Sequence, residues 1–217
     1  MRVLVACEFS GVVRDAFLEQ GFEALSCDVL ESERPGPHYV GDVREVLEDG
    51  WDAMIAHPPC TALTRAADWK YRDSQARSDA LAFVLQLWEA PIPHVAIENP
   101  RGLNRHWRQP DQTIQPWYFG HEERKTTMLW LRALPPLLPT ALMERTDRNT
   151  INGQNKLGPS LHRWRDRSRT YAGVAAAMAE QWGDFLLREH RRQYHDPRDL
   201  AAEPCCFACC DCSEADI

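Results

Sequence analysis

The stretch RVLVACEFSGVVRDAFLEQ, residues 2–20, predicts the first strand, turn and helix of an α/β fold. Residues 2–6 are mostly apolar, as expected of a strand that is buried on both faces of a sheet. Residues 7–11 are expected to turn the chain. Residues 12–20 carry apolar side chains at helical spacing and end before Gly21, a residue type that often terminates helices. A buried strand followed at once by an amphipathic helix is typical of sheets with helical crossovers.

Strands and helices continue to alternate along the chain. Further strands are predicted at residues 22–27, 51–56, 94–97, 113–119 and 126–131, with helices at 74–89 and 172–187 and a short helix ending at 47. Residues 36–41 are predicted to be loop. This order predicts an α/β fold with a mostly parallel, doubly wound sheet.

The length of 217 residues suits one α/β domain rather than two large ones. We assign residues 1–187 to this domain. Within it, residues 132–169 are rich in polar residues and proline, and they are predicted to form an irregular insert. Residues 188–217 are charged and then rich in cysteine, and we predict that they form a C-terminal tail.

The formal net charge of −7 argues against tight autonomous binding to duplex DNA, because such binding normally needs a basic face. No apolar run is as long as a membrane span, and the first residues lack the apolar stretch of a signal peptide. We therefore expect a cytoplasmic protein with no membrane partner, in which the cysteines are reduced.

Five of the eight cysteines lie close together in the tail. Thiolates at such short range suit a soft metal ion. However, their spacing is not that of a zinc finger, no histidine follows them, and adjacent cysteines have difficulty reaching one tetrahedral ion. We therefore favour a tail that binds no metal. The five cysteines are only weak candidate ligands: Cys205, Cys206, Cys209, Cys210 and Cys212.

Acidic residues stand where the predicted strands end, at the edge where parallel sheets bind ligands. Glu8 follows the first strand, Asp28 the second, and Asp42 the loop after it. An acid after the second strand suits hydrogen bonds to ribose hydroxyls, although each acid taken singly is also typical of ordinary loops. The first turn has a single glycine and lacks the GxGxxG pattern, which argues against a dinucleotide cofactor.

A cysteine and a glutamate follow two neighbouring predicted strands, in His57-Pro58-Pro59-Cys60 and Glu98-Asn99-Pro100. A cysteine is most often buried and inert. Here it follows two prolines in a rigid loop at a strand end, which is a poor position for filling a core. A thiol and a carboxylate in this arrangement are suited to attack and protonate a pyrimidine ring.

Together these motifs resemble the cytosine-C5 DNA methyltransferase family, which has a Pro-Cys nucleophile loop and a Glu-Asn motif. Residues 6–11 are similar to the cofactor turn of that family, residues 119–127 to its late basic stretch, and residues 170–175 to its final turn and helix. The resemblance covers residues 2–187. It is closest to short, phage-type members that lack a sizeable target-recognition domain.

The resemblance implies a Rossmann-like methyltransferase core that binds S-adenosyl-L-methionine. It implies cofactor contacts at the ends of the first strands and in the nucleophile loop: Cys7, Glu8, Phe9, Ser10, Gly11, Asp28, Val29, Asp42, Val43, His57 and Pro58. It implies catalytic roles for Cys60, Glu98, Asn99 and Lys125, and substrate contacts for Pro59, Thr61, Pro100 and Thr127.

The reaction that the resemblance implies is covalent. The Cys60 thiolate would add to C6 of cytosine and make C5 nucleophilic enough to accept a methyl group. Glu98 would hydrogen bond N3 and the exocyclic amine, Asn99 would shape its loop, and Lys125 would contact the base carbonyl or a phosphate. A cytosine in duplex DNA would first have to be flipped out of the stack.

Three features depart from the family's pattern. Thr61 stands where glutamine is usual, and Lys125 and Thr127 stand where arginines are usual. Residues 132–169 replace a much larger target-recognition domain. The expected substrate is therefore DNA that is single-stranded, bound without sequence preference or presented by a partner, or else a cytosine mononucleotide (dCMP or dCTP).

Four arginines alternate along one polar segment, Arg163, Arg165, Arg167 and Arg169. In an extended chain their side chains would lie on one side and could bind phosphates. A solvated loop is an equally good interpretation, because Asp166 dilutes the charge.

Two other classes of function stay open. His57-Pro58-Pro59 partly resembles the loop of methyltransferases that act on exocyclic amines, although those enzymes place a stacking aromatic residue where Cys60 stands. A catalytically silent nucleic-acid-binding accessory protein could keep the same fold without binding the cofactor.

Overall fold

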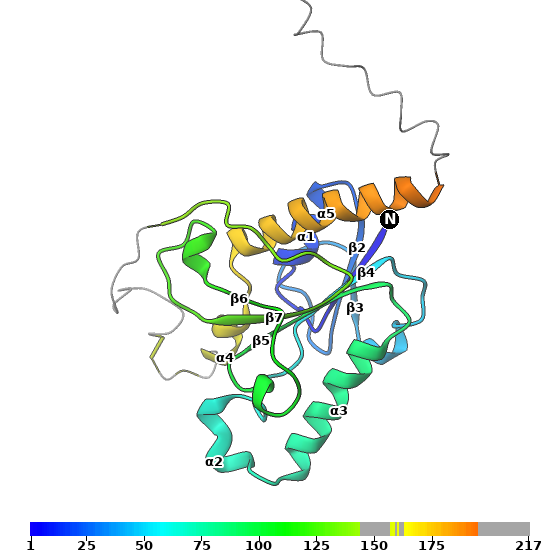
Figure 1. Ribbon diagram of the computed structural model, residues 1–217. Helices are drawn as coiled ribbons and strands as arrows, with labels where there is room; N and C mark the ends of the chain where they lie inside the picture. Colours follow the sequence, from blue (N-terminus) through cyan, green and yellow to red (C-terminus); the bar gives the residue numbers. More distant parts are fainter. Residues whose placement is uncertain (144–156, 159, 161–162, 195–217) are drawn as a thin grey trace, which may run out of the picture.

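The structure is a computed structural model that describes residues 1–143, 157–158, 160 and 163–194 (Figure 1). The five tail cysteines proposed as weak metal ligands lie outside the described residues.

Seven strands form one sheet in the order β3-β2-β1-β4-β5-β7-β6. Among them only β7 runs against its neighbours, so the prediction of a mostly parallel sheet is confirmed. The strand order reverses between β1 and β4, and the carboxyl ends at such a switch point are where open α/β sheets bind ligands. The strands are β1 (Arg2–Ala6), β2 (Glu23–Asp28), β3 (His38–Val40), β4 (Ala53–Ala56), β5 (His94–Pro100), β6 (Gln112–Ile114) and β7 (Thr127–Arg132).

Helices cover both faces of this sheet (Figure 1). On one face α1 (Val12–Glu19) packs beside α5 (Ala172–Tyr194), and their core side chains include Phe17 and Trp182. On the other face α3 (Gln75–Glu89) contributes Leu87 to a core that includes Trp130. Two shorter helices, α2 (Asp68–Tyr71) and α4 (Arg163–Ser168), lie in the connections. The regularly spaced apolar side chains of α1, α3 and α5 therefore face the sheet, as predicted.

Several boundaries differ from the sequence prediction because backbone pairing and proline decide them. The predicted loop 36–41 contains β3, which pairs with β2 and is held by His38 through Ser26 Oγ (2.8 Å) and the Leu30 carbonyl (2.8 Å). The predicted strand 113–119 is only β6, followed by a 3₁₀ turn at Pro116–Tyr118, since proline has no N–H for a strand ladder. The last helix continues beyond 187 to Tyr194, and α4 forms inside the predicted irregular insert.

Arg14 is completely buried in α1 and holds the segment between β2 and β3 against that helix. Its guanidinium donates hydrogen bonds to Ser26 Oγ (3.2 Å), Ser32 Oγ (3.0 Å) and the Pro35 carbonyl (3.1 Å), and it pairs with Asp15 Oδ1 (2.6 Å). A buried charge is tolerated only where its hydrogen-bonding groups are satisfied. This network therefore positions the segment that follows Asp28 at the carboxyl edge of the sheet.

Replacing Arg14 with methionine should lower the free energy of unfolding by about 3–5 kcal/mol, because the partly buried Asp15 and the buried Ser26 hydroxyl lose their partner. Arg34→Gln is the matched control, since Arg34 pairs with the same Asp15 (3.4 Å) from an exposed position. It should cost less than about 1 kcal/mol. Equal losses for the two variants in urea unfolding would contradict the structural role assigned to Arg14.

Candidate functional site

The loop that carries Cys60 begins at the switch point of the sheet. β4 ends at Ala56, and the His57 N–H donates to the Ala6 carbonyl at the end of β1 (2.9 Å). Two proline residues follow, and the Cys60 carbonyl then accepts the N–H groups of Leu63 (2.9 Å) and Thr64 (2.8 Å). These bonds close a compact turn in which Cys60 is half-buried.

The Glu-Asn motif at the end of β5 holds this loop at two points. His57 Nδ1 donates to Glu98 Oε2 (3.1 Å), and Asn99 Nδ2 donates to the Pro58 carbonyl (3.0 Å). β4 and β5 are parallel neighbours with Ala56 paired to Ile97, so His57, which follows β4, and Glu98, near the end of β5, meet at one edge of the sheet. The structure thus brings the two sequence motifs together.

Lys125 reaches the same edge because β7 is antiparallel to β5. Thr127 at the start of β7 is paired with Pro100 at the end of β5, so Lys125 lies beside Glu98 rather than at the far end of the strand. Lys125 Nζ donates to the carbonyl of Arg167 in α4 (2.8 Å). This bond orients the ammonium group toward the site.

Cys60, Glu98 and Lys125 are close enough to shift one another's pKa values. Burial and the Glu98 carboxylate raise the pKa of the Cys60 thiol, and Lys125 opposes that shift. Burial acts to raise the pKa of Glu98, but the His57 hydrogen bond and Lys125 leave it below its ordinary value. Burial lowers the pKa of Lys125, against the attraction of Glu98 and Cys60. At neutral pH the site therefore contains a protonated thiol beside a carboxylate.

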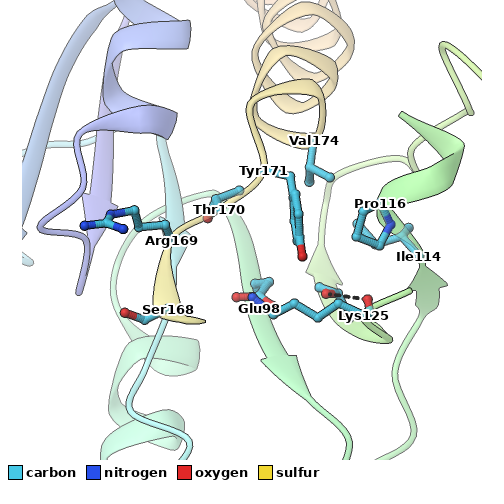
Figure 2. Close-up of a pocket in the computed structure, with 10 residues that line it drawn as sticks. Glu98, Ile114, Pro116, Lys125, Ser168, Arg169, Thr170, Tyr171 and Val174 are labelled. Carbon is cyan, nitrogen blue, oxygen red and sulfur yellow. Dashed lines mark hydrogen bonds between the residues drawn. The ribbon is translucent and has the colours of Figure 1, made fainter. Parts of the chain in front are cut away.

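Glu98 and Lys125 line a pocket whose other wall comes from the start of α5 (Figure 2). Figure 2 shows Tyr171 in the middle of the pocket, with its hydroxyl pointing toward the side where Glu98 and Lys125 lie. The Tyr171 hydroxyl donates to the Glu123 carboxylate, and Lys125 Nζ lies 5.5 Å from the Tyr171 ring centroid. Sequence reasoning did not single out Tyr171, and the signal that could have found it was its place in the turn before the last helix.

The four predicted substrate contacts fall into two pairs, and of the four only Thr127 lines this pocket. Pro59 and Thr61 flank Cys60 and are exposed. Pro100 and Thr127 face each other across β5 and β7, and Thr127 is buried, with its Oγ1 donating to the Lys125 carbonyl (3.3 Å). Pro59 and Thr61 are therefore open to a ligand, whereas Thr127 supports Lys125.

In the first turn, Glu8 and Ser10 stabilise the start of α1. The buried Glu8 carboxylate accepts the backbone N–H groups of Val13 (2.8 Å) and Arg14 (3.3 Å), and it also accepts a hydrogen bond from Ser10 Oγ (2.8 Å). A carboxylate is stabilising at a helix N-terminus. Both oxygens of Glu8 are engaged inside the protein, so its side chain is explained by the fold. The neighbouring Phe9 is buried beneath the Arg165 guanidinium.

The remaining predicted cofactor contacts differ in their accessibility. Asp28 ends β2 half-buried, and it forms no salt bridge within the described part of the chain. Val29 beside it is 75% exposed. Asp42 instead accepts hydrogen bonds from Arg44 Nε (2.9 Å), and the Val43 side chain is buried in the core. Asp28 and Val29 therefore form the open part of this edge.

The residues at this edge fit an S-adenosylmethionine molecule in part. Burial raises the pKa of Asp28, whose carboxylate is suited to accept ribose hydroxyls. The exposed Val29 side chain provides an apolar surface of the kind on which an adenine ring packs. Cys7 and Gly11, both at positive φ, bring the backbone of the first turn to the same edge. Asp28, Val29 and this backbone are the groups that would hold the cofactor.

The alternating arginines do not form an extended row, because residues 163–168 are the helix α4. In a helix, residues two apart point about 200° away from each other around the axis. Arg165 and Arg169 both pair with Glu33 in the segment after β2 (3.0 and 2.7 Å). Arg167 is exposed, and the Arg163 side chain lies outside what the structure describes. The predicted row is therefore wrong, and Arg165 and Arg169 instead tether α4 to Glu33.

Gly102 locks the loops after β4 and β5 together, a role that sequence reasoning missed. The Arg65 N–H donates to the Arg101 carbonyl (3.1 Å), and a Cβ on Gly102 would lie 2.0 Å from the Leu63 carbonyl oxygen. Gly102 also has a φ of 147°, which L side chains rarely adopt. This close approach keeps the Cys60 loop against the segment after Glu98.

Within the described residues, no group of three or more histidine, cysteine, aspartate or glutamate side chains is arranged to hold a metal ion. None of the described helices combines the length and apolarity needed to cross a bilayer. No protein-family model matches this chain, and no curated protein matches it.

Gly102→Ala should be more destabilising than Gly21→Ala, although both residues have positive φ. A Cβ on Gly21 would meet no heavy atom within 4 Å, so its substitution should cost only about 1–2 kcal/mol of backbone strain. At Gly102 the clash with Leu63 should add about 1–3 kcal/mol. Urea unfolding of both variants tests this difference, and equal losses would show that the two loops are not locked at Gly102.

The pH dependence of Cys60 alkylation should reveal its charged neighbours. Only the thiolate reacts, so a raised pKa moves the rate curve to higher pH. Glu98→Gln removes a negative charge and should move the curve to lower pH, whereas Lys125→Met should move it to higher pH. Iodoacetamide labelling, followed by mass spectrometry of the Cys60 peptide, measures both shifts. A Glu98→Gln curve that stays in place or moves upward would refute this electrostatic arrangement.

Proposed function

We propose that this protein is an S-adenosylmethionine-dependent methyltransferase that modifies C5 of cytosine in DNA, with Cys60 as the nucleophile. The observation that carries the proposal is the convergence of Cys60, Glu98 and Lys125 beside the switch point of a Rossmann-like sheet. A thiol, a carboxylate and an ammonium group are the three functions that covalent activation of a pyrimidine needs.

Each of the three residues has a distinct task. The Cys60 thiolate forms a bond to C6, and the electrons of the C5–C6 double bond become available at C5. Glu98 accepts a hydrogen bond from the exocyclic amine, and Lys125 stabilises negative charge that develops on the ring carbonyl oxygen. After C5 has been methylated, it loses its proton to solvent, the C6–S bond breaks, and the Cys60 thiolate is released.

Because the Cys60 thiol is protonated at rest, its proton passes by way of Glu98 to N3 as the C6–S bond forms, and it returns to the thiolate when that bond breaks. His57 Nδ1 donates to the ionised Glu98 carboxylate (3.1 Å) and holds it in place for this transfer. Two buried atoms near the loop, His57 Nε2 and Asn99 Oδ1, have no hydrogen-bond partner among the described residues. Buried polar atoms are normally satisfied, which supports a polar ligand or water in this part of the site.

S-adenosylmethionine, when bound, supplies an electrophilic methyl group. Asp28 would accept its ribose hydroxyls and Val29 would cover its adenine ring, at the ends of strands adjoining the switch point. The proposal also places the protein in the cytoplasm, where Cys60 stays reduced. Methylation of an exocyclic amine does not use a thiol, so it would not explain Cys60. A catalytically silent accessory protein would not explain why Cys60, Glu98 and Lys125 lie together.

Cys60→Ser should abolish transfer of labelled methyl groups from S-adenosylmethionine to cytosine-containing DNA, because a hydroxyl is a far weaker nucleophile than a thiolate. Cys27→Ser is the matched control. Burial raises the pKa of Cys27 to about 12, so it is an inert thiol, and its Sγ donates to the Gly41 carbonyl as a serine hydroxyl can. The control should keep its activity.

A covalent readout completes the test. In 5-fluorocytosine the C5 hydrogen is replaced by fluorine, so no proton can leave and the adduct to Cys60 should persist in denaturing mass spectrometry. Full activity of Cys60→Ser would eliminate the covalent mechanism. Failure to bind S-adenosylmethionine in an equilibrium titration would eliminate both methyltransferase interpretations and favour the accessory protein.

A further inference from the structure

Four cations beside the nucleophile loop lack a carboxylate partner. Arg65 follows the Cys60 turn, Lys70 is in α2, and Arg101 and Arg105 flank the turn at Gly102. Within the described ranges none of them is in a salt bridge, whereas Arg44, Arg108, Arg165 and Arg169 are all paired. Arg65, Arg101 and Arg105 are exposed, as is Lys70, so an anion from solution can reach them.

Trp69 is the most exposed large apolar side chain in the described part of the protein, at 81%. It lies in α2 between Arg65 and the N-terminus of α3, on the segment that leaves the nucleophile loop. Successive turns keep it near the site, since the Thr64 N–H donates to the Cys60 carbonyl (2.8 Å) and the Ala67 N–H to the Thr64 carbonyl (3.1 Å). An indole this exposed buries little apolar surface and therefore contributes little to the stability of the fold.

The two loops therefore form one surface with an aromatic platform and unpaired cations. We propose that this surface, consisting of Trp69, Arg65, Lys70, Arg101 and Arg105, binds single-stranded DNA and presents one of its bases to Cys60. Binding by the surface is independent of the chemistry, but presentation to Cys60 rests on the proposed function. Bases stack on Trp69 and phosphates contact the cations, the combination that single-strand binding proteins use.

Single-stranded DNA fits this surface better than duplex DNA does. Bases in a duplex are stacked on each other and leave no face for Trp69, whereas every base in a single strand has one. Duplex binding usually draws on a broad basic face, and the net charge of this chain is −7. A few cations without salt bridges among the described residues, beside one aromatic residue, are suited to bind a short stretch of single-stranded DNA.

The test is the affinity of the full-length chain for a fluorescein-labelled oligo(dC), measured by fluorescence anisotropy. Trp69→Ala should weaken binding by about 5- to 150-fold, the equivalent of one lost stacked base, and Trp69→Phe should restore most of the affinity. Arg65→Gln and Arg101→Gln should each reduce the dependence of affinity on salt, because each removes a phosphate contact.

Two variants serve as controls, since each resembles a test residue but lies outside the surface. Leu138 is 69% exposed and apolar, in the loop that is hydrogen bonded to Gln181 of α5, and Arg192 is exposed but paired with Glu189. Leu138→Ala and Arg192→Gln should leave binding unchanged.

Three outcomes would overturn the proposal: no binding of oligo(dC), binding that does not depend on Trp69, or tighter Trp69-independent binding of duplex DNA. A Trp69→Ala variant that changes only the oligomeric state would assign the surface to a second copy of the chain instead. Methylation of dCMP or dCTP by a protein that fails to bind oligo(dC) would leave the proposed chemistry intact and remove only this surface.

Discussion

Two hydrogen bonds between the ends of β4 and β5 organise the candidate site. His57 Nδ1 bonds Glu98, and Asn99 Nδ2 bonds the Pro58 carbonyl, so the residues on either side of the prolines are both held by β5. Parallel pairing of the two strands sets the height at which these groups meet. The close approach at Gly102 then keeps the chain beyond Cys60 against the chain beyond Glu98. Without these hydrogen bonds and this close approach, the two loops would not be held in a fixed position relative to each other.

The antiparallel strand β7 adds a positive charge, Lys125, to the site formed by these two loops. Its antiparallel pairing with β5 delivers Lys125 to the carboxyl edge, where an additional parallel strand would have delivered its other end. The partly buried setting strengthens the interactions of Cys60, Glu98 and Lys125, because fewer water molecules screen them. The same contacts explain the protonated resting thiol, since burial and Glu98 outweigh the effect of Lys125 on its pKa. A substrate that neutralises Glu98 would favour the thiolate, because it removes the negative charge that raises the pKa of Cys60.

Charged side chains around the ends of β1 and β2 are used mainly for structure. Glu8 caps α1 and Arg14 fixes the segment after β2, while Glu33 in that segment holds Arg165 and Arg169 of the α4 region. The carbonyl of Arg167 in the same helix holds Lys125. One chain of contacts therefore connects the first turn of the sheet to the proposed catalytic ammonium group. On the other side of Cys60, four cations that form no salt bridge within the described residues accompany Trp69: Arg65, Lys70, Arg101 and Arg105.

The sequence by itself determined the α/β order, the positions of Cys60 and Glu98 at strand ends, and the group of candidate residues, because buried strands and amphipathic helices follow a local periodicity. It could not determine β3, which depends on pairing with β2, or the helical form of residues 163–168, which removed the predicted row of arginines. Nor could local pattern show that Tyr171 faces Lys125, that Gly102 joins two loops, or that Trp69 is left exposed. These depend on which segments pack against each other at long range, and only the tertiary structure decides that.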